Sequence, residues 1–169
     1  MGALGFSKNN IMIDFETLGT SENSIVLSMG VVEFNQGCSV KGDYWEFDVP
    51  MQILAGRTID PSSVSWWRRT NPDELLRLLE SGQEQLSVMA SRLLEFYPRR
   101  DVSIWSRGYM DFAILNSILE ADAYPYWVHR DVRTMDVFGI PIEKNSHNAL
   151  EDCRNQVEYV QKVLRRFDG

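Results

Sequence analysis

Cysteine and histidine are scarce in this sequence of 169 residues, which has two of each. The cysteines, Cys38 and Cys153, lie far apart and follow no paired spacing, which excludes a small scaffold held together by disulfides. No apolar run approaches transmembrane length, and no secretory signal is recognisable at the amino end. We therefore expect a cytoplasmic protein that does not enter a membrane.

Positive charge is also scarce. The net charge is -7 and the pI is about 4.8, whereas domains that coat nucleic acid by bulk electrostatics are usually basic. This class of protein is disfavoured, although clustered carboxylates that bind divalent cations would reverse the local sign of the charge. The positive residues are thirteen arginines and four lysines, and the planar guanidinium group suits phosphate recognition.

The composition is that of one ordinary globular domain, with 44% hydrophobic and 24% charged residues. We expect this domain to span residues 1–169, with residues 1–9 as a short disordered arm. Alternating and β-branched apolar residues predict an antiparallel meander of three strands. The first lies within 11–18 and is followed by a turn over 19–23, and the others span 24–35 and 42–50. The patterns further along predict helices over 61–70, 73–80, 84–96, 109–121 and 149–166, strands over 102–106 and 130–136, and a loop over 141–148. The fold class is therefore α/β.

Two carboxylates stand in the first predicted strand, in the stretch IMIDFETLGT. Side chains alternate between faces along a strand, so Asp14 and Glu16 share one face while Phe15 points to the other. Like charges a few ångströms apart repel, and in a low-dielectric setting this costs roughly several kcal/mol unless a proton or a cation compensates. The alternative is a strand that ends at Asp14 and leaves both acids solvated in a loop.

Two further acids fall at the start of predicted helices. Asp111 lies in the first turn after the fourth strand, and Asp152 lies in the first turn of the last helix, five residues after His147. Each acid alone is explained by the preference for negative charge near a helix N-terminus. Together with the pair in the first strand, they could converge at the end of the sheet, where open α/β folds place their sites.

Such a set of oxygen ligands suits Mg²⁺ or Mn²⁺ rather than zinc. Two of these ions about 3.5–4 Å apart can clamp a phosphodiester, one activating a water molecule and the other stabilising the leaving oxygen. His147, in the loop beside them, could then remove the proton from the attacking water, because imidazole exchanges protons near neutral pH.

The motifs IDFETLG, GYMDFAIL and HNALED occur in this order, and with them the chain resembles the DEDDh branch of the 3′→5′ exonucleases in the ribonuclease H-like superfamily. The resemblance extends from Ile11 to about Val163, and the third motif has the H-x-x-x-x-D spacing of this branch. The SVSWW segment and the SHNALEDC ending are most similar to the group of ribonuclease AS and the T-even phage exonuclease A, which act on RNA and on DNA respectively. The resemblance implies a mixed five-stranded sheet with antiparallel first strands, flanked by helices, and release of nucleoside 5′-monophosphates from a 3′ end.

The resemblance also implies roles for the acids and the histidine. Asp14 would bind both of two Mg²⁺ or Mn²⁺ ions. Glu16 and Asp152 would bind the ion on the side of the nucleophile, and Asp111 would bind the ion on the side of the leaving group. His147 would be the general base.

Substrate contacts are expected just after the first motif, where the family holds the terminal nucleotide. Phe15, Thr17 and Leu18 would form this site, with Leu18 wedged against the last base. Trp66 could stack on a base, although one member of the tryptophan pair at 66–67 is expected in the core. Arg107, at the end of the fourth strand, could reach the same pocket.

Other polar residues near the motifs have more ordinary interpretations. We assign Asp136 to capping and His129 to the surface. Glu151 could compete with Asp152 as a ligand, because it stands four residues after the motif histidine. Arg133 could contact phosphate or pair with an acid.

The expected substrate is single-stranded RNA or DNA with a 3′ end, or a 3′ overhang, with RNA slightly favoured. The choice stays open because contacts to the 2′-hydroxyl can come from backbone groups. The alternative is an inactive nucleic-acid-binding module of the same fold, against which the intact set of acids and histidine speaks. A zinc or single-metal phosphoesterase would have an unusual ligand set. Related enzymes often self-associate, so a homodimer is one expected assembly, in a bacterial or phage-infected cell.

Overall fold

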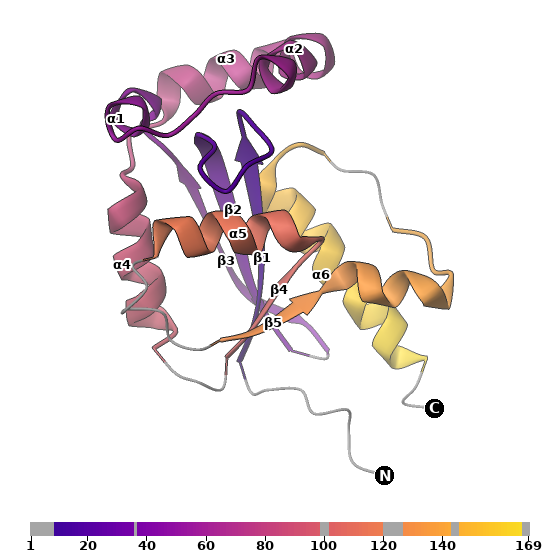
Figure 1. The fold of residues 1–169 in the computed structure, drawn as a ribbon. Coiled ribbons are helices and arrows are strands. Elements are labelled where there is room, and N and C mark those ends of the chain that lie inside the picture. The colour runs from indigo at the N-terminus through magenta and orange to yellow at the C-terminus, as the bar shows by residue number, and fades with distance from the viewer. Residues whose placement is uncertain (1–8, 36, 99–101, 120–126, 143–145, 167–169) are drawn as a thin grey trace.

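The computed structural model describes residues 9–35, 37–98, 102–119, 127–142 and 146–166. Its centre is a sheet with the strand order β3-β2-β1-β4-β5 (Figure 1). β1 (Asn9–Thr17) is antiparallel to β2 (Val26–Phe34), which is antiparallel to β3 (Ser39–Glu46). On its other side β1 is parallel to β4 (Val102–Ser106), which is parallel to β5 (Val128–Asp131). The expected mixed five-stranded sheet is confirmed.

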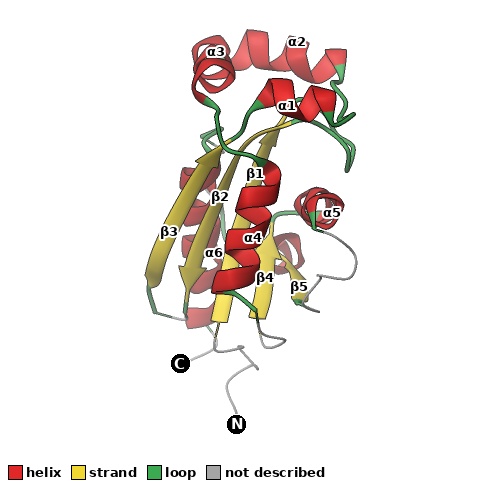
Figure 2. Ribbon diagram, turned by 90° about the vertical axis from the view of Figure 1, so that its left-hand side faces the viewer, coloured by secondary structure: helices red, strands yellow, loops and turns green. Residues whose placement is uncertain are grey.

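Helices cover both faces of the sheet and one of its ends. α4 (Leu86–Phe96) and α5 (Tyr109–Ile118) pack on one face, and α6 (Ala149–Arg165) packs on the other (Figure 2). The carboxyl end of β1 points toward a third group of helices, at the top of Figure 1: α1 (Val49–Leu54), α2 (Pro61–Thr70) and α3 (Pro72–Ser81).

The residues of β1 alternate between the two covered faces. Ile11, Ile13 and Phe15 belong to the core cluster that includes residues of α4 and α5. Met12 belongs to the cluster on the side of α6, beside Val157. Because the alternation has a period of two, the side chains at positions 14 and 16 also face α6. These two acids therefore share the face of the sheet that α6 covers.

Two predicted strands end earlier than expected. β3 stops at Glu46, since Asp48 accepts a hydrogen bond from the N–H of Met51 (2.8 Å) and Pro50 stands in the first turn, so α1 begins where the strand was expected to continue. The strand expected over 130–136 runs instead from 128 to 131. A 3₁₀ helix, η2 (Val132–Phe138), follows it, because Asp131 accepts a hydrogen bond from the N–H of residue 133 (2.9 Å).

The ends of other elements differ slightly from the predictions. Of the arm expected over residues 1–9, residues 1–8 lie outside the described part of the chain, while Asn9 already pairs with Val102 in the sheet. The last two residues of the helix expected over 109–121 also lie outside the described residues. None of the described helices is long and apolar enough to cross a membrane.

Candidate active site

The acids of β1 lie near its carboxyl end, under the first turns of α6. Asp14 is in register with Gly30 of β2, and a Cβ atom on Gly30 would collide with the backbone of Ala149 at the start of α6. The glycine therefore allows the helix to approach the sheet closely. This close approach brings Asp152, in the first turn of the helix, to the two acids of the strand.

α5 supplies the third position of the site. Asp111 lies in its first turn, and the backbone N–H of Phe15 donates a hydrogen bond to Asp111 Oδ1 (3.1 Å). The helix begins after Gly108, whose φ of 121° is one that residues with a side chain rarely adopt. The guanidinium of Arg133 fills the space above this glycine, 2.8 Å from where a Cβ atom would lie. A positive group therefore stands at the start of the helix that carries Asp111.

Asp152 also holds the loop that precedes α6. This side chain is only 2% exposed, and its carboxylate accepts hydrogen bonds from the N–H (2.7 Å) and the hydroxyl (3.0 Å) of Ser146 and from the N–H of His147 (3.1 Å). His147 has a φ of 60°, in the left-handed region. Ligand atoms of Glu16, His147 and Asp152 all lie within 4.8 Å of one another. One buried carboxylate thus belongs to a group of residues that could hold a metal ion and also positions the loop histidine.

Three of the acids have a raised pKa, mainly because they are buried. Burial raises the pKa of Asp14 well above its usual value, and the charges of Asp111 and Glu16 raise it further. Burial raises the pKa of Glu16 to about 8, with contributions from Asp152 and Asp111. Burial also raises the pKa of Asp111 to about 7, against the opposing hydrogen bond from the N–H of Phe15. Without a cation, these groups hold protons near neutral pH.

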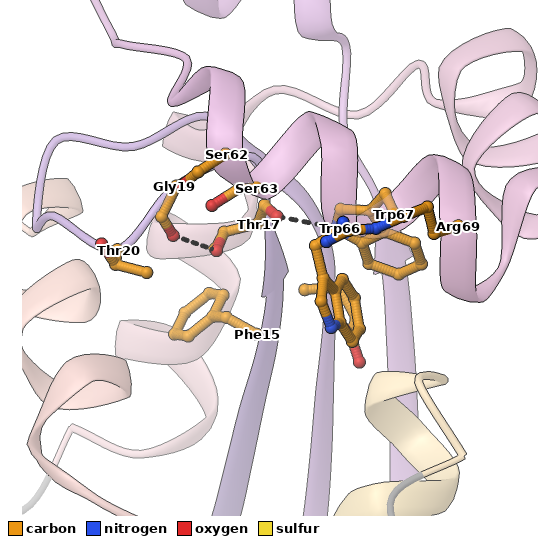
Figure 3. Close-up of a pocket in the computed structure, with 10 residues that line it drawn as sticks. Phe15, Thr17, Gly19, Thr20, Ser62, Ser63, Trp66, Trp67 and Arg69 are labelled. Atoms are coloured by element: carbon orange, nitrogen blue, oxygen red, sulfur yellow. Dashed lines mark hydrogen bonds between the residues drawn. The ribbon is translucent and has the colours of Figure 1, made fainter.

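A cavity of about 430 Å³ opens beside one of the acids, Glu16, between the end of β1 and α2 (Figure 3). Phe15 and Trp66 form apolar walls, and Trp66 is 37% exposed. Trp67 is buried, and its indole N–H donates a hydrogen bond to the carbonyl of Thr17 (2.9 Å), so this tryptophan ties β1 to α2. The other lining residues are mostly polar: Glu16, Thr17, Gly19, Thr20, Ser62, Ser63 and Arg69.

The histidine of the third motif adjoins this cavity. The rings of Trp66 and His147 lie edge to face with centroids 4.8 Å apart, and the ring of Trp67 is 6.2 Å from the same imidazole. An aromatic wall of the cavity is therefore in direct contact with the expected general base.

Two expected substrate contacts lie elsewhere. Leu18 is 3% exposed and packs with Trp67 and Leu75 in the core beneath α2 and α3, so it is not placed to wedge against a base. Arg107 does not line the cavity. Its guanidinium donates two hydrogen bonds of 3.1 Å to the carboxylate of Asp136.

The structure also distinguishes among the other polar residues. Asp136 does not cap an element as expected: it pairs with an arginine and accepts a hydrogen bond from the hydroxyl of Tyr159 (3.1 Å). His129 is exposed, as expected, and its ring stacks on Phe112 with centroids 4.4 Å apart. Glu151 is exposed, so on α6 it is the neighbouring acid at position 152 that joins the cluster.

One polar neighbour of the acids was not identified from the sequence. Gln156 of α6 donates a hydrogen bond from Nε2 to Asp14 Oδ1 (2.9 Å). The spacing holds a signal that could have revealed it, since residues four apart share a face of a helix and this glutamine follows Asp152 by four.

Comparison with known proteins identifies the family of this site. A family model described as the 3′-5′ exoribonuclease Rv2179c-like domain matches residues 9–164. The chain belongs to this family. Its sequence is also 21% identical, over 207 residues, to the exodeoxyribonuclease of Enterobacteria phage T4, a match that covers 95% of this chain and 91% of that protein.

Solved structures share the fold of this Rv2179c-like domain. The zinc-bound complex of E. coli exonuclease I with single-stranded DNA matches with a TM-score of 0.68 and 12% identity, over 94% of this chain and 41% of that one. The structure of S. pombe Pop2p, in its Mg²⁺- and Mn²⁺-bound form, matches with a TM-score of 0.66 and 13% identity, over 94% of this chain and 84% of that one. The domain thus spans about two fifths of the exonuclease I chain. The expected ribonuclease H-like fold, the DEDD exonuclease family and the class of 3′–5′ exonuclease are confirmed.

The site of the Rv2179c-like domain fits divalent cations, as its family implies. The donors are mainly carboxylate oxygens, which Mg²⁺ and Mn²⁺ prefer, and they come from three elements that the fold holds in place. The raised pKa values of Glu16 and Asp111 also fit a cation site. Partly buried carboxylates that lie close together need a positive partner in order to ionise together. A cation would replace the protons that these groups otherwise hold.

The metal-free Rv2179c-like domain is expected to lose stability as the pH rises. Carboxyl groups with a raised pKa bind protons more tightly in the folded chain than in the unfolded one. Their stabilisation is therefore complete below the unfolded pKa of about 4 and is lost as the pH rises through about 7 to 8. The loss should be of the order of a few kcal/mol, and Mg²⁺ should restore it by binding the ionised groups.

Thermal unfolding in EDTA and in Mg²⁺, at a series of pH values from about 5 to 9, would measure this effect. The stabilisation by Mg²⁺ should grow with pH. If Mg²⁺ raised the unfolding temperature equally at every pH, the acids with raised pKa values would not be the groups that bind Mg²⁺.

Proposed function

We propose that this domain removes nucleotides one at a time from the 3′ end of single-stranded RNA, or of a 3′ overhang, and releases nucleoside 5′-monophosphates. The observation that carries the proposal is the convergence of four acids beside a cavity of about 430 Å³. Pockets for small ligands span roughly 300–1,000 Å³, so this cavity can take one terminal nucleotide. The acids are Asp14, Glu16, Asp111 and Asp152.

The four acids would hold two Mg²⁺ or Mn²⁺ ions. Once bound, the ions would supply Lewis acidity to the scissile phosphate and lower the pKa of a water molecule. The protein contributes the fixed directions of the carboxylates. The N–H of Phe15 holds Asp111, and the N–H groups of Ser146 and His147 hold Asp152.

His147 would accept the proton that the attacking water loses. Its backbone N–H donates to Asp152 and its ring rests on the edge of Trp66, so contacts from two helices hold it in place. The water oxygen forms a new bond to phosphorus, and the bond from phosphorus to the 3′ oxygen of the preceding nucleotide breaks. That oxygen takes up a proton and becomes the new 3′ end.

The cavity would bind the terminal nucleotide. Phe15 and Trp66 offer aromatic surfaces on which the base can stack. Because every base can stack in this way, such contacts tolerate different nucleotide sequences. The hydroxyls of Thr17 and Ser63 donate to Gly19 and Asp60 but can still accept hydrogen bonds from the sugar. Arg69 offers a positive charge to a phosphate.

RNA is the proposed substrate because the matching family is described as exoribonuclease. The phage relative is described as an exodeoxyribonuclease, so DNA is the competing substrate. A time course on RNA and DNA of one sequence, single-stranded and labelled at the 5′ end, would separate them in Mg²⁺. We expect a ladder that shortens from the 3′ end, faster on RNA, and no ladder with Asp14→Asn. Faster loss of DNA would make DNA the substrate. If neither strand is degraded in Mg²⁺ or Mn²⁺, the exonuclease proposal is wrong and the alternative, an inactive binding module of the same fold, is favoured.

A further inference from the structure

Gln156 is a buried amide that bonds to one of the acids. Its side chain is 2% exposed, and its Nε2 donates to Asp14 Oδ1 at 2.9 Å. Within the described segments, no other group donates a hydrogen bond to the Asp14 carboxylate. By contrast, Asp111 and Asp152 are held by backbone N–H groups.

The other end of this amide makes no compensating contact. Gln156 Oε1 is buried and has no hydrogen-bond partner among the described residues. An unpaired buried carbonyl is destabilising, and methionine or leucine would fill the same space without that cost. Packing alone therefore does not explain a glutamine at this position. The hydrogen bond that Gln156 donates to Asp14 explains it.

The direction of the amide is determined by its partner. An ionised carboxylate only accepts hydrogen bonds, so Nε2 rather than Oε1 must face Asp14 whenever this acid is charged. A donor that approaches one oxygen limits rotation of the carboxylate and leaves lone pairs of both oxygens free for other ligands. Asp152 and Gln156 are four residues apart on α6, so one rigid helix presents a ligand and this donor together.

We propose that Gln156 is a positioning residue that holds the Asp14 carboxylate in the orientation needed to bind divalent cations. The inference rests on the proposed function, because it assumes that Asp14 is a metal ligand. It adds an amide from α6 to the residues on which metal affinity depends.

The test replaces the amide by an apolar side chain of similar length, in the full chain. Gln156→Met should lower the affinity for Mn²⁺, measured by calorimetry, by about 10–100-fold, the usual effect of losing a partner of a metal ligand. The kcat on labelled RNA should fall in Mn²⁺ below saturation and recover in part at high Mn²⁺, with little change in the KM for RNA. If Gln156→Met does not fold, Gln156→Leu offers the same loss of the donor with a different shape.

Gln161 provides a matched control on the same helix. It is 5% exposed, and its Nε2 donates to the carbonyl of Asn35 (2.8 Å), a group outside the acid cluster. Gln161→Met should leave the Mn²⁺ affinity unchanged. An equal loss of affinity in both variants, or no loss in Gln156→Met, would overturn the positioning role while the exonuclease proposal stands. A wild-type chain that binds no Mn²⁺ would overturn both.

Discussion

Replacement of Asp14 by asparagine should lower kcat by at least about 10³-fold while the protein stays folded. Asparagine keeps the shape of the side chain and can still accept the bond from Gln156. It removes the negative charge at the position expected to bind both cations. Several kcal/mol of transition-state stabilisation are then lost, and each 1.4 kcal/mol, roughly, is tenfold in rate.

The same substitution should raise the unfolding temperature of the metal-free protein at about pH 8. Burial and the charges of Asp111 and Glu16 raise the pKa of Asp14, so an uncharged group at this position relieves their repulsion. Active-site groups are commonly held at a cost to stability, so a substitution that abolishes catalysis can also stabilise the fold. Time courses on labelled RNA and thermal unfolding in EDTA would measure the two effects.

Glu151→Gln is the matched control for Asp14→Asn. It removes one negative charge from an exposed residue that adjoins Asp152, and it should leave kcat within about twofold. Turnover by Asp14→Asn at saturating Mg²⁺ would show that the metal assignment is wrong.

Replacement of His147 by asparagine should lower kcat by about 10²–10⁴-fold at neutral pH, with little change in the KM for RNA. Asparagine is the appropriate substitution because this residue has a φ of 60°, a conformation that asparagine tolerates better than alanine. A histidine base must be neutral to accept a proton, so the wild-type rate at saturating Mg²⁺ should rise with pH. The variant should lack this rise.

His129→Asn is the control for that result, since it removes the only other histidine of the chain. His129 stacks on Phe112, on the side of the sheet that α5 covers, and does not line the cavity. Its replacement should leave the rise in rate with pH unchanged. A pH–rate profile of His147→Asn that matches the wild type would exclude this histidine as the base.

Much of the fold could be predicted from local patterns. The period of two in IMIDFET predicted that Asp14 and Glu16 share a face, and the core clusters on either side of β1 have this alternation. The start of α2 could also be predicted, because Asp60 accepts a hydrogen bond from the N–H of Ser62 (2.9 Å) and Pro61 follows the cap. Such signals depend on bonds between residues a few positions apart.

Predictions that depended on distant partners were less successful. Leu18 follows the first motif directly, yet it packs in the core because α2 and α3 fold over it. Asp136 looked like a cap, but Arg107, from the end of β4, lies within hydrogen-bond distance of it. The strand expected over 130–136 ended at Asp131 because its partner β4 ends at Ser106, which pairs with that residue, and a cap at Asp131 turned the chain into a 3₁₀ helix.

The sequence by itself predicted the chemistry proposed for this protein: the four acids, the histidine and their order along the chain resemble those of the DEDDh exonucleases, and the matching family is described as a 3′-5′ exoribonuclease domain. The tertiary structure decided which groups surround these residues. The collision that any larger residue at position 30 would cause with α6, the aromatic contact between Trp66 and His147, and the bond from Gln156 to Asp14 all join distant segments. Spacing along a chain predicts which face a side chain occupies, but the partner on that face is set by how the helices pack against the sheet.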